Sequence, residues 1–125
     1  MAHNMVGWFE IPVNDMNRAK QFYDKVFKID IQIHDLGGVL MGWFPFAEEK
    51  KGSSGSLISH ESYEPSDKAG VLIYFSSADV EDELRRVEAA GGKILQKKTL
   101  ISPAIGYMAL FLDSEGNRLA LHSRK

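Results

Sequence analysis

Four polar side chains in predicted strands have the chemistry of acids, bases or hydrogen-bonding groups, and a glutamate is the most informative of them. Glu10 stands between Phe9 and Ile11, and burying a carboxylate in such a segment is costly unless it is paired or hydrogen-bonded. We predict that burial raises the pKa of Glu10 toward neutrality, so that it acts as a general base or accepts a hydrogen bond from a ligand. The alternative is a carboxylate at a rim, solvated or paired with an arginine.

The other three polar groups are two histidines and a tyrosine. His122 has an ordinary pKa near ~6.5, which suits a proton shuttle or a ligand donor, although it is also typical of a half-exposed residue at a strand end. Tyr74 is positioned either to hydrogen-bond a ligand carbonyl or to lie in the core with its hydroxyl satisfied. His60 ends a strand before a polar loop.

The elements that position these residues follow one order, which occurs twice. A strand over Gly7–Val13 precedes a helix capped by Asn14-Asp15, because apolar residues then recur at helical spacing up to Phe27. The second half has a strand over Val71–Ser76 and a helix that begins after Asp79 and ends at Gly91-Gly92. The remaining predicted strands are 29–33, 39–46 and 56–60 in the first half, and 93–99, 107–112 and 118–122 in the second.

This order is βαβββ in each half, which predicts an α+β fold made of paired modules. The first module covers about residues 5–61, the second about 70–123, and one domain is expected over 1–125. The helix starts, Asn14–Met16 and Ala78–Val80, match at an offset of 64 residues, whereas the last strands, Gly55–His60 and Asn117–His122, match at 62. A duplicated pattern indicates a pseudo-symmetric fold.

The composition excludes several classes of protein. The chain has 125 residues, no cysteine and a net charge of −2, so disulfide frameworks, thiolate metal sites and cysteine catalysis are excluded. The charge balance predicts neither nucleic acid nor a membrane surface as a partner. No apolar run approaches the ~20 residues of a membrane span, and no signal peptide is evident, so we expect a cytoplasmic protein.

Several segments together resemble the vicinal oxygen chelate superfamily, which includes glyoxalase I, bleomycin-resistance proteins and extradiol dioxygenases. They are Phe9–Ala19 followed by Phe22-Tyr23, Val87–Lys93, and Phe111–Arg118. The resemblance implies paired βαβββ modules whose mixed sheet curls into a cup, and a homodimer. In the superfamily's metalloenzymes it also implies a divalent ion held in the cup by four side chains, two from each module.

The four implied ligand positions carry residues that are unsuited to a metal. They correspond to Trp8, Leu72, Ala120 and, by the internal register, Ile58, with Ser56 as an alternative at the last position. Such side chains do not provide the oxygen and imidazole donors that divalent sites require. We therefore expect no metal cofactor.

Strand alternation places Glu10, Tyr74, His122 and His60 one pleat step beyond those positions, on the same face. We predict a small apolar or aromatic molecule as the partner, bound in the cup by Trp8, Trp43, Leu72, Tyr74 and Ala120. The alternative is an enzyme, a lyase, isomerase or dioxygenase-like protein. It would use Glu10 as base with His122, or a divalent metal relocated to Glu10, His60 and His122.

Overall fold

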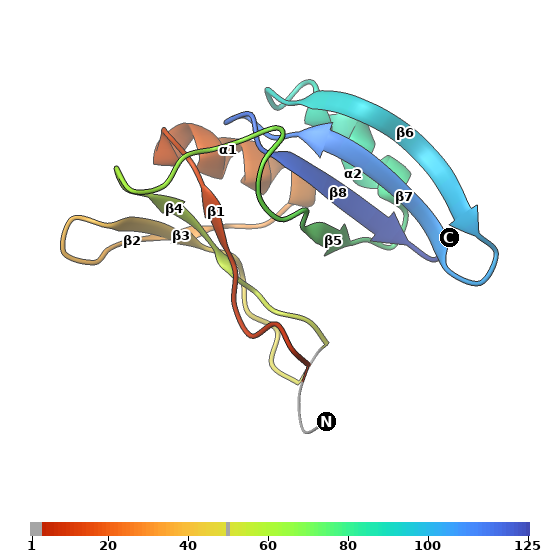
Figure 1. Ribbon diagram of the computed structural model, residues 1–125, viewed down its shortest axis with the longest axis horizontal. Coiled ribbons are helices and arrows are strands. Elements are labelled where there is room, and N and C mark those ends of the chain that lie inside the picture. The colour runs from red at the N-terminus through yellow and green to blue at the C-terminus, as the bar shows by residue number, and fades with distance from the viewer. Residues whose placement is uncertain (1–3, 50) are drawn as a thin grey trace.

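The computed structural model describes residues 4–49 and 51–125; residues 1–3 and 50, which the predicted domain includes, lie outside this range. Within it the predicted order βαβββ occurs twice, as Figure 1 shows. The first module contains β1 (Glu10–Pro12), α1 (Met16–Phe27), β2 (Gln32–Asp35), β3 (Leu40–Trp43) and β4 (Ser56–Ser59). The second contains β5 (Tyr74–Ser76), α2 (Val80–Val87), β6 (Lys93–Ser102), β7 (Gly106–Leu112) and β8 (Arg118–Ser123).

Each module forms its own four-stranded mixed sheet, with the order β1-β4-β3-β2 in the first and β5-β8-β7-β6 in the second. The first strand of each module pairs in parallel with the last, and the other neighbours are antiparallel. The two sheets splay apart (Figure 1). The predicted α+β fold with mixed sheets is thus confirmed.

The helices begin where the sequence predicts, because an aspartate caps each of them. The Asp15 carboxylate accepts a hydrogen bond from the Arg18 amide, and that of Asp79 accepts one from the Glu81 amide. Helix α1 packs on β3 and β4, α2 packs on β6, β7 and β8, and the two helices pack on each other. The core therefore lies between the helices and the sheets.

Close packing of the second module against helix α1 requires a glycine at position 92. A Cβ atom on Gly92 would lie 2.3 Å from the Leu112 carbonyl oxygen and 2.6 Å from the ring of Phe22. Phe22 and Phe111, both fully buried, stack with ring centroids 6.2 Å apart. The glycine after α2 thus allows the second module to close over the first helix.

The strand pairing corrects the internal register of the repeat. Ser56 pairs with Glu10, and Ala120 pairs with Tyr74. Both pairs are related by 64 residues, like the caps Asp15 and Asp79. The predicted offset of 62 for the last strands is therefore wrong, and Ser56 rather than Ile58 is the counterpart of Ala120. The similar residue types of Gly55–His60 and Asn117–His122 gave the wrong offset, because equivalence is determined by which residues pair in the hydrogen-bonded ladder.

Several predicted strands are shorter or displaced in the structure. Strand β3 has four residues rather than the eight of 39–46, and β2 spans Gln32–Asp35 rather than 29–33. Strand β1 has three residues rather than the seven of Gly7–Val13, and β5 has three rather than the six of Val71–Ser76. Both are edge strands with one neighbour each, so a ladder forms only where β4 or β8 runs alongside. Neither helix of the described chain is long and apolar enough to cross a membrane.

Candidate functional site

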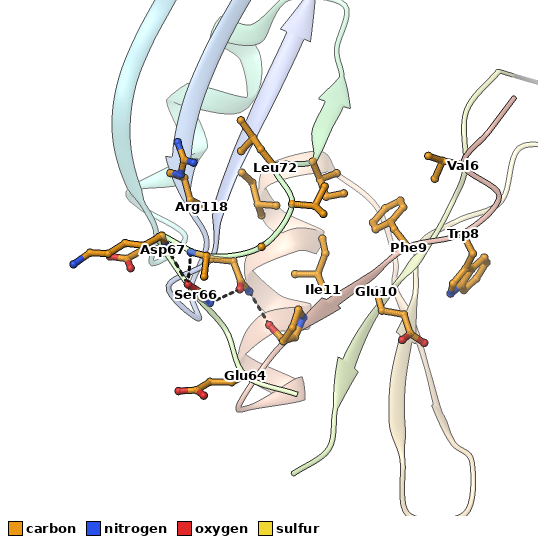
Figure 2. A pocket seen from close by; sticks show the side chains of 18 residues that line it. Val6, Trp8, Phe9, Glu10, Ile11, Glu64, Ser66, Asp67, Leu72 and Arg118 are labelled. Atoms are coloured by element: carbon orange, nitrogen blue, oxygen red, sulfur yellow. Dashed lines mark hydrogen bonds between the residues drawn. The ribbon is translucent and has the colours of Figure 1, made fainter. Parts of the chain in front are cut away.

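A cavity of about 500 Å³ lies between the two modules, where β1 faces the segment that leads into β5 (Figure 2). One wall is the chain around β1, and the other is the connection between the modules together with the start of β8. Most of its lining is apolar, which is the usual form of a small-molecule site. The lining residues are Val6, Trp8, Phe9, Glu10, Ile11, Pro12, Glu64, Ser66, Asp67, Lys68, Ala69, Gly70, Val71, Leu72, Ile73, Asn117, Arg118 and Leu119.

Three of the residues predicted for the site line this cavity, namely Trp8, Glu10 and Leu72. Tyr74 and Ala120 do not line it, although they pair with each other on β5 and β8. The Tyr74 side chain is 51% exposed, whereas Ala120 is fully buried. The structure therefore brings part of the predicted set together, and the binding roles of Tyr74 and Ala120 stay predictions.

Trp43 joins the site through Trp8 rather than by lining the cavity. The two rings meet edge to face, with centroids 6.2 Å apart and planes at 81°. The imidazole of His34 lies 4.2 Å from the Trp43 ring centroid. Both tryptophans keep a large exposed area, 45% for Trp8 and 40% for Trp43. They form an open aromatic surface that continues the wall of the cavity.

Glu10 is exposed, so the prediction that it is buried is wrong. On the short β1 strand the alternate residue Ile11 is directed into the core and Glu10 to the open face. Its partner is the hydroxyl of Tyr63, whose pKa is raised by the hydrogen bond to Glu10 and by the charge of that carboxylate. The structure thus removes the burial on which a raised pKa of Glu10 was predicted, and its role as a base stays a prediction.

The two histidines have backbone partners outside the cavity. The Nε2 atom of His122 lies 2.8 Å from the Ile105 carbonyl oxygen. The Nδ1 atom of His60 accepts a hydrogen bond from the Ser62 amide at 3.1 Å, and His60 lines a second, more polar cavity of about 750 Å³ beside Tyr63. No group of three or more metal-binding side chains forms within the described residues. Within the described residues Glu10, His60 and His122 thus do not form a metal-binding group.

The four metal positions that the resemblance implies are, with the corrected register, Trp8, Leu72, Ser56 and Ala120. Ser56 alone offers an oxygen, and its hydroxyl is buried without a hydrogen-bond partner among the described residues. A divalent ion needs several oxygen, nitrogen or thiolate donors, and one hydroxyl among an indole and two aliphatic side chains does not supply them. These residues do not fit the metal.

The wall formed by the connection between the modules was missed, because polar residues from Glu61 to Gly70 indicated only a boundary. The Ser66 amide donates to Oδ1 of Asn117, and the Arg118 amide donates to the Ser66 carbonyl oxygen. The side-chain amide of Asn117 also donates to the Pro12 carbonyl oxygen at 2.7 Å. The signal in the sequence was Asn117 itself, since a hairpin asparagine is well suited to bind neighbouring backbone.

A buried polar network that is hydrogen-bonded to Asn117 of the cavity wall ties the second module to the first helix. The Tyr23 hydroxyl donates to Asp113 at 2.6 Å, and the carboxylate of Glu115 accepts from the amides of Asn14 and Asp15, both at 2.8 Å, and from Arg18. Burial raises the pKa of Asp113 despite these hydrogen bonds. Burial also acts to raise the pKa of Glu115, but the hydrogen bonds from Arg18 and the two amides outweigh it and lower that pKa.

Comparison with known proteins identifies the family that shares this fold. Residues 5–121 match the family model of the Glyoxalase/Bleomycin resistance protein/Dioxygenase superfamily. A glyoxylase-like domain-containing protein of Didymella fabae is 26% identical over 129 residues, which cover 99% of this chain and 97% of that protein.

Two solved structures illustrate the likeness in fold. A variant of glyoxalase I from Zea mays has a TM-score of 0.74 at 21% identity. The match covers 94% of this chain and 45% of the maize protein, so this chain spans about half the length of that protein. TnmS3, an antibiotic binding protein from Streptomyces sp. CB03234, has a TM-score of 0.64 at 23% identity, with 100% of this chain and 99% of that one covered. With nearly all of its length matched by the family model, the chain belongs to the Glyoxalase/Bleomycin resistance protein/Dioxygenase superfamily.

Proposed function

We propose that this protein binds a small apolar or aromatic molecule in the cavity between β1 and β5, and that it does so without the four-ligand metal centre. The cavity carries this proposal, because its volume of about 500 Å³ and its largely apolar lining suit such a molecule. The residues at the four metal positions support the second part. The antibiotic-binding TnmS3 is consistent with the ligand class.

A thermal-shift screen with polycyclic aromatic compounds tests the binding. A compound that binds the folded state at a hundredfold excess over its Kd stabilises it by about 2.7 kcal/mol, which a shift in Tm reports. Leu72→Arg introduces a long charged side chain into the cavity and should abolish the shift. Leu36→Arg is the matched control, because Leu36 is 53% exposed and does not line the cavity. A panel without any stabilising compound, or an undiminished shift in Leu72→Arg, would contradict the proposal.

Metal analysis tests the second part directly. Protein purified without chelators should contain far less than one divalent ion per chain. A stoichiometric ion would show that a metal is held by residues other than the four that the superfamily employs, and the metal-free proposal would be wrong.

We also propose that the protein is a homodimer in which the β6–β7 hairpin forms part of the interface. Leu95, Leu100, Ile101 and Ile105 lie on or beside this hairpin and are 42–50% exposed. Several large apolar side chains left exposed on one hairpin favour an interface there. Sedimentation should give twice the mass of one chain, and Leu100→Lys should halve it. Phe46→Lys, at a residue that is 71% exposed elsewhere in the chain, should leave the mass unchanged; a monomeric unmodified protein would refute the dimer.

A further inference from the structure

The aromatic surface beside the cavity has the form of a partly built binding site. Trp8 and Trp43 stand at 81° to each other and are 45% and 40% exposed. Large aromatic side chains that remain open to solvent in a contiguous group mark binding surfaces. Two rings at nearly a right angle present two sides of an aromatic cage.

Strand pairing places a carboxylate in the same row as one of these rings. Trp43 of β3 pairs with Ser56 of β4, and Ser56 pairs with Glu10 of β1. Residues paired across neighbouring strands share a face of the sheet, so the small side chain of Ser56 separates the ring from the carboxylate. The Ser56 hydroxyl is buried and has no hydrogen-bond partner in the part of the chain that the structure describes. The hydroxyl is therefore closed to a ligand, and the groups of this row that a ligand can reach are Trp43 and Glu10.

The carboxylate of Glu10 is available on that face. Figure 2 shows the side chains of Trp8, just before β1, and of Glu10, in β1, extending to the same side. The Tyr63 hydroxyl is hydrogen-bonded to Glu10, but a neutral hydroxyl leaves the negative charge of the carboxylate in place. A carboxylate beside aromatic ring faces attracts a cation twice, through its charge and through the quadrupole of the rings.

Within the described residues, no lysine or arginine makes a cation–π contact with Trp8 or Trp43. The cation–π contact found there is Lys98 over the ring of Tyr107, at 4.6 Å from its centroid, in the second module. The imidazole of His34 packs against one side of Trp43, with ring centroids 4.2 Å apart. An external cation therefore has Trp8 and the other side of Trp43 to contact.

We propose that Trp8, Trp43 and Glu10 bind the cationic head of the ligand, a quaternary or protonated amine, while its apolar part enters the cavity. This inference rests on the proposed function, because Trp8 and Glu10 line the same cavity. The ligand class is thereby narrowed from an apolar molecule to an amphipathic organic cation.

Three probes with the same ring test the charge preference by titration calorimetry: benzyltrimethylammonium, benzyl alcohol and benzoate. We expect the cation to bind at least about tenfold more tightly than the alcohol, and benzoate to bind weakest. Glu10→Gln, which keeps the hydrogen bond to Tyr63, should reduce the preference for the cation about tenfold. Glu61→Gln removes the same charge from an exposed residue that does not line this cavity and should leave the preference unchanged.

The unmodified protein gives a second measurement that requires no variant. Trp8 and Trp43 are the two tryptophans of the sequence, so a change in tryptophan emission on addition of benzyltrimethylammonium reports on this site. Equal binding of the cation and the alcohol, unchanged emission, or an equal effect of Glu61→Gln would overturn the cation site. If an aromatic compound still stabilises the protein in the thermal-shift screen, the cavity function stands although the cation site is wrong. Failure of that screen refutes the cavity function separately.

Discussion

Glu115 offers the sharpest test of how the modules are held together, because a single carboxylate joins the second module to the start of α1. Its side chain has 0% exposure, and its Oε1 atom accepts from the Asn14 and Asp15 amides and from Arg18 at 2.8–2.9 Å. Its Oε2 atom accepts from Nε of Arg18 at 2.7 Å. Glu115→Gln preserves the shape but places an amide where Oε2 receives this bond and removes the charge.

The free energy of unfolding lost in Glu115→Gln depends on the hydrogen bonds that the buried carboxylate accepts. One charge-assisted bond contributes about 1.5–3 kcal/mol, and the donors left facing the new amide remain unpaired. Arg18 is 53% exposed, which lets water replace part of the loss. We therefore expect Glu115→Gln to lower the free energy of unfolding by about 2–3 kcal/mol, which corresponds to a decrease in Tm of roughly 6–15 °C for a chain of this size.

The pH dependence separates this reason from a general effect of substitution. The pKa of Glu115 in the folded state is lowered from its ordinary value of 4.5, so its contribution is complete above that value and is lost as the pH falls through the folded pKa. Urea unfolding followed by circular dichroism should show the full difference at pH 7 and a smaller one near pH 4. A difference below about 0.5 kcal/mol at pH 7, or one that does not shrink in acid, would refute the reasoning.

Two further substitutions test the same contact between the modules. Tyr23→Phe removes the donor to buried Asp113 and should cost about 1–3 kcal/mol in urea unfolding at pH 7; an unchanged midpoint would contradict this. Burial raises the pKa of Asp113, and the hydrogen bond from Tyr23 opposes that rise by stabilising the charged carboxylate. The loss of unfolding free energy in Tyr23→Phe should therefore shrink as the pH falls and Asp113 becomes protonated. Gly92→Ala should cost about 1–3 kcal/mol because its Cβ meets the Leu112 carbonyl oxygen, whereas Gly7→Ala, with nothing within 4 Å, should have little effect on Tm; equal effects would refute the steric argument.

The sequence was sufficient to predict the elements because local signals determine them. Asp15 and Asp79 cap their helices as expected, and Gly91 adopts the left-handed φ of 105° expected after a helix. These features depend on neighbours a few residues away. The βαβββ order can therefore be predicted without knowledge of the tertiary structure.

The site was harder to predict, because it depends on register and on contacts between distant segments. The exposure of Glu10 follows from which face of β1 packs on the core, and the counterpart of Ala120 follows from which residues pair across the sheets. His60 lies beyond the last residue of β4, Ser59, where the chain has already turned. None of these is fixed by residue type or spacing.

The position of the cavity has a consequence for how the protein unfolds. Its two walls belong to sheets that share no strand, since the chain runs β1 to β4 in one and β5 to β8 in the other. A ligand held by both walls adds a cross-link between them, so it makes their opening more cooperative as well as rarer. Hydrogen exchange should therefore slow together at amides of both walls, at Ile11 and at Ile73, when the ligand is bound. Protection confined to one wall would show that the ligand contacts one module alone.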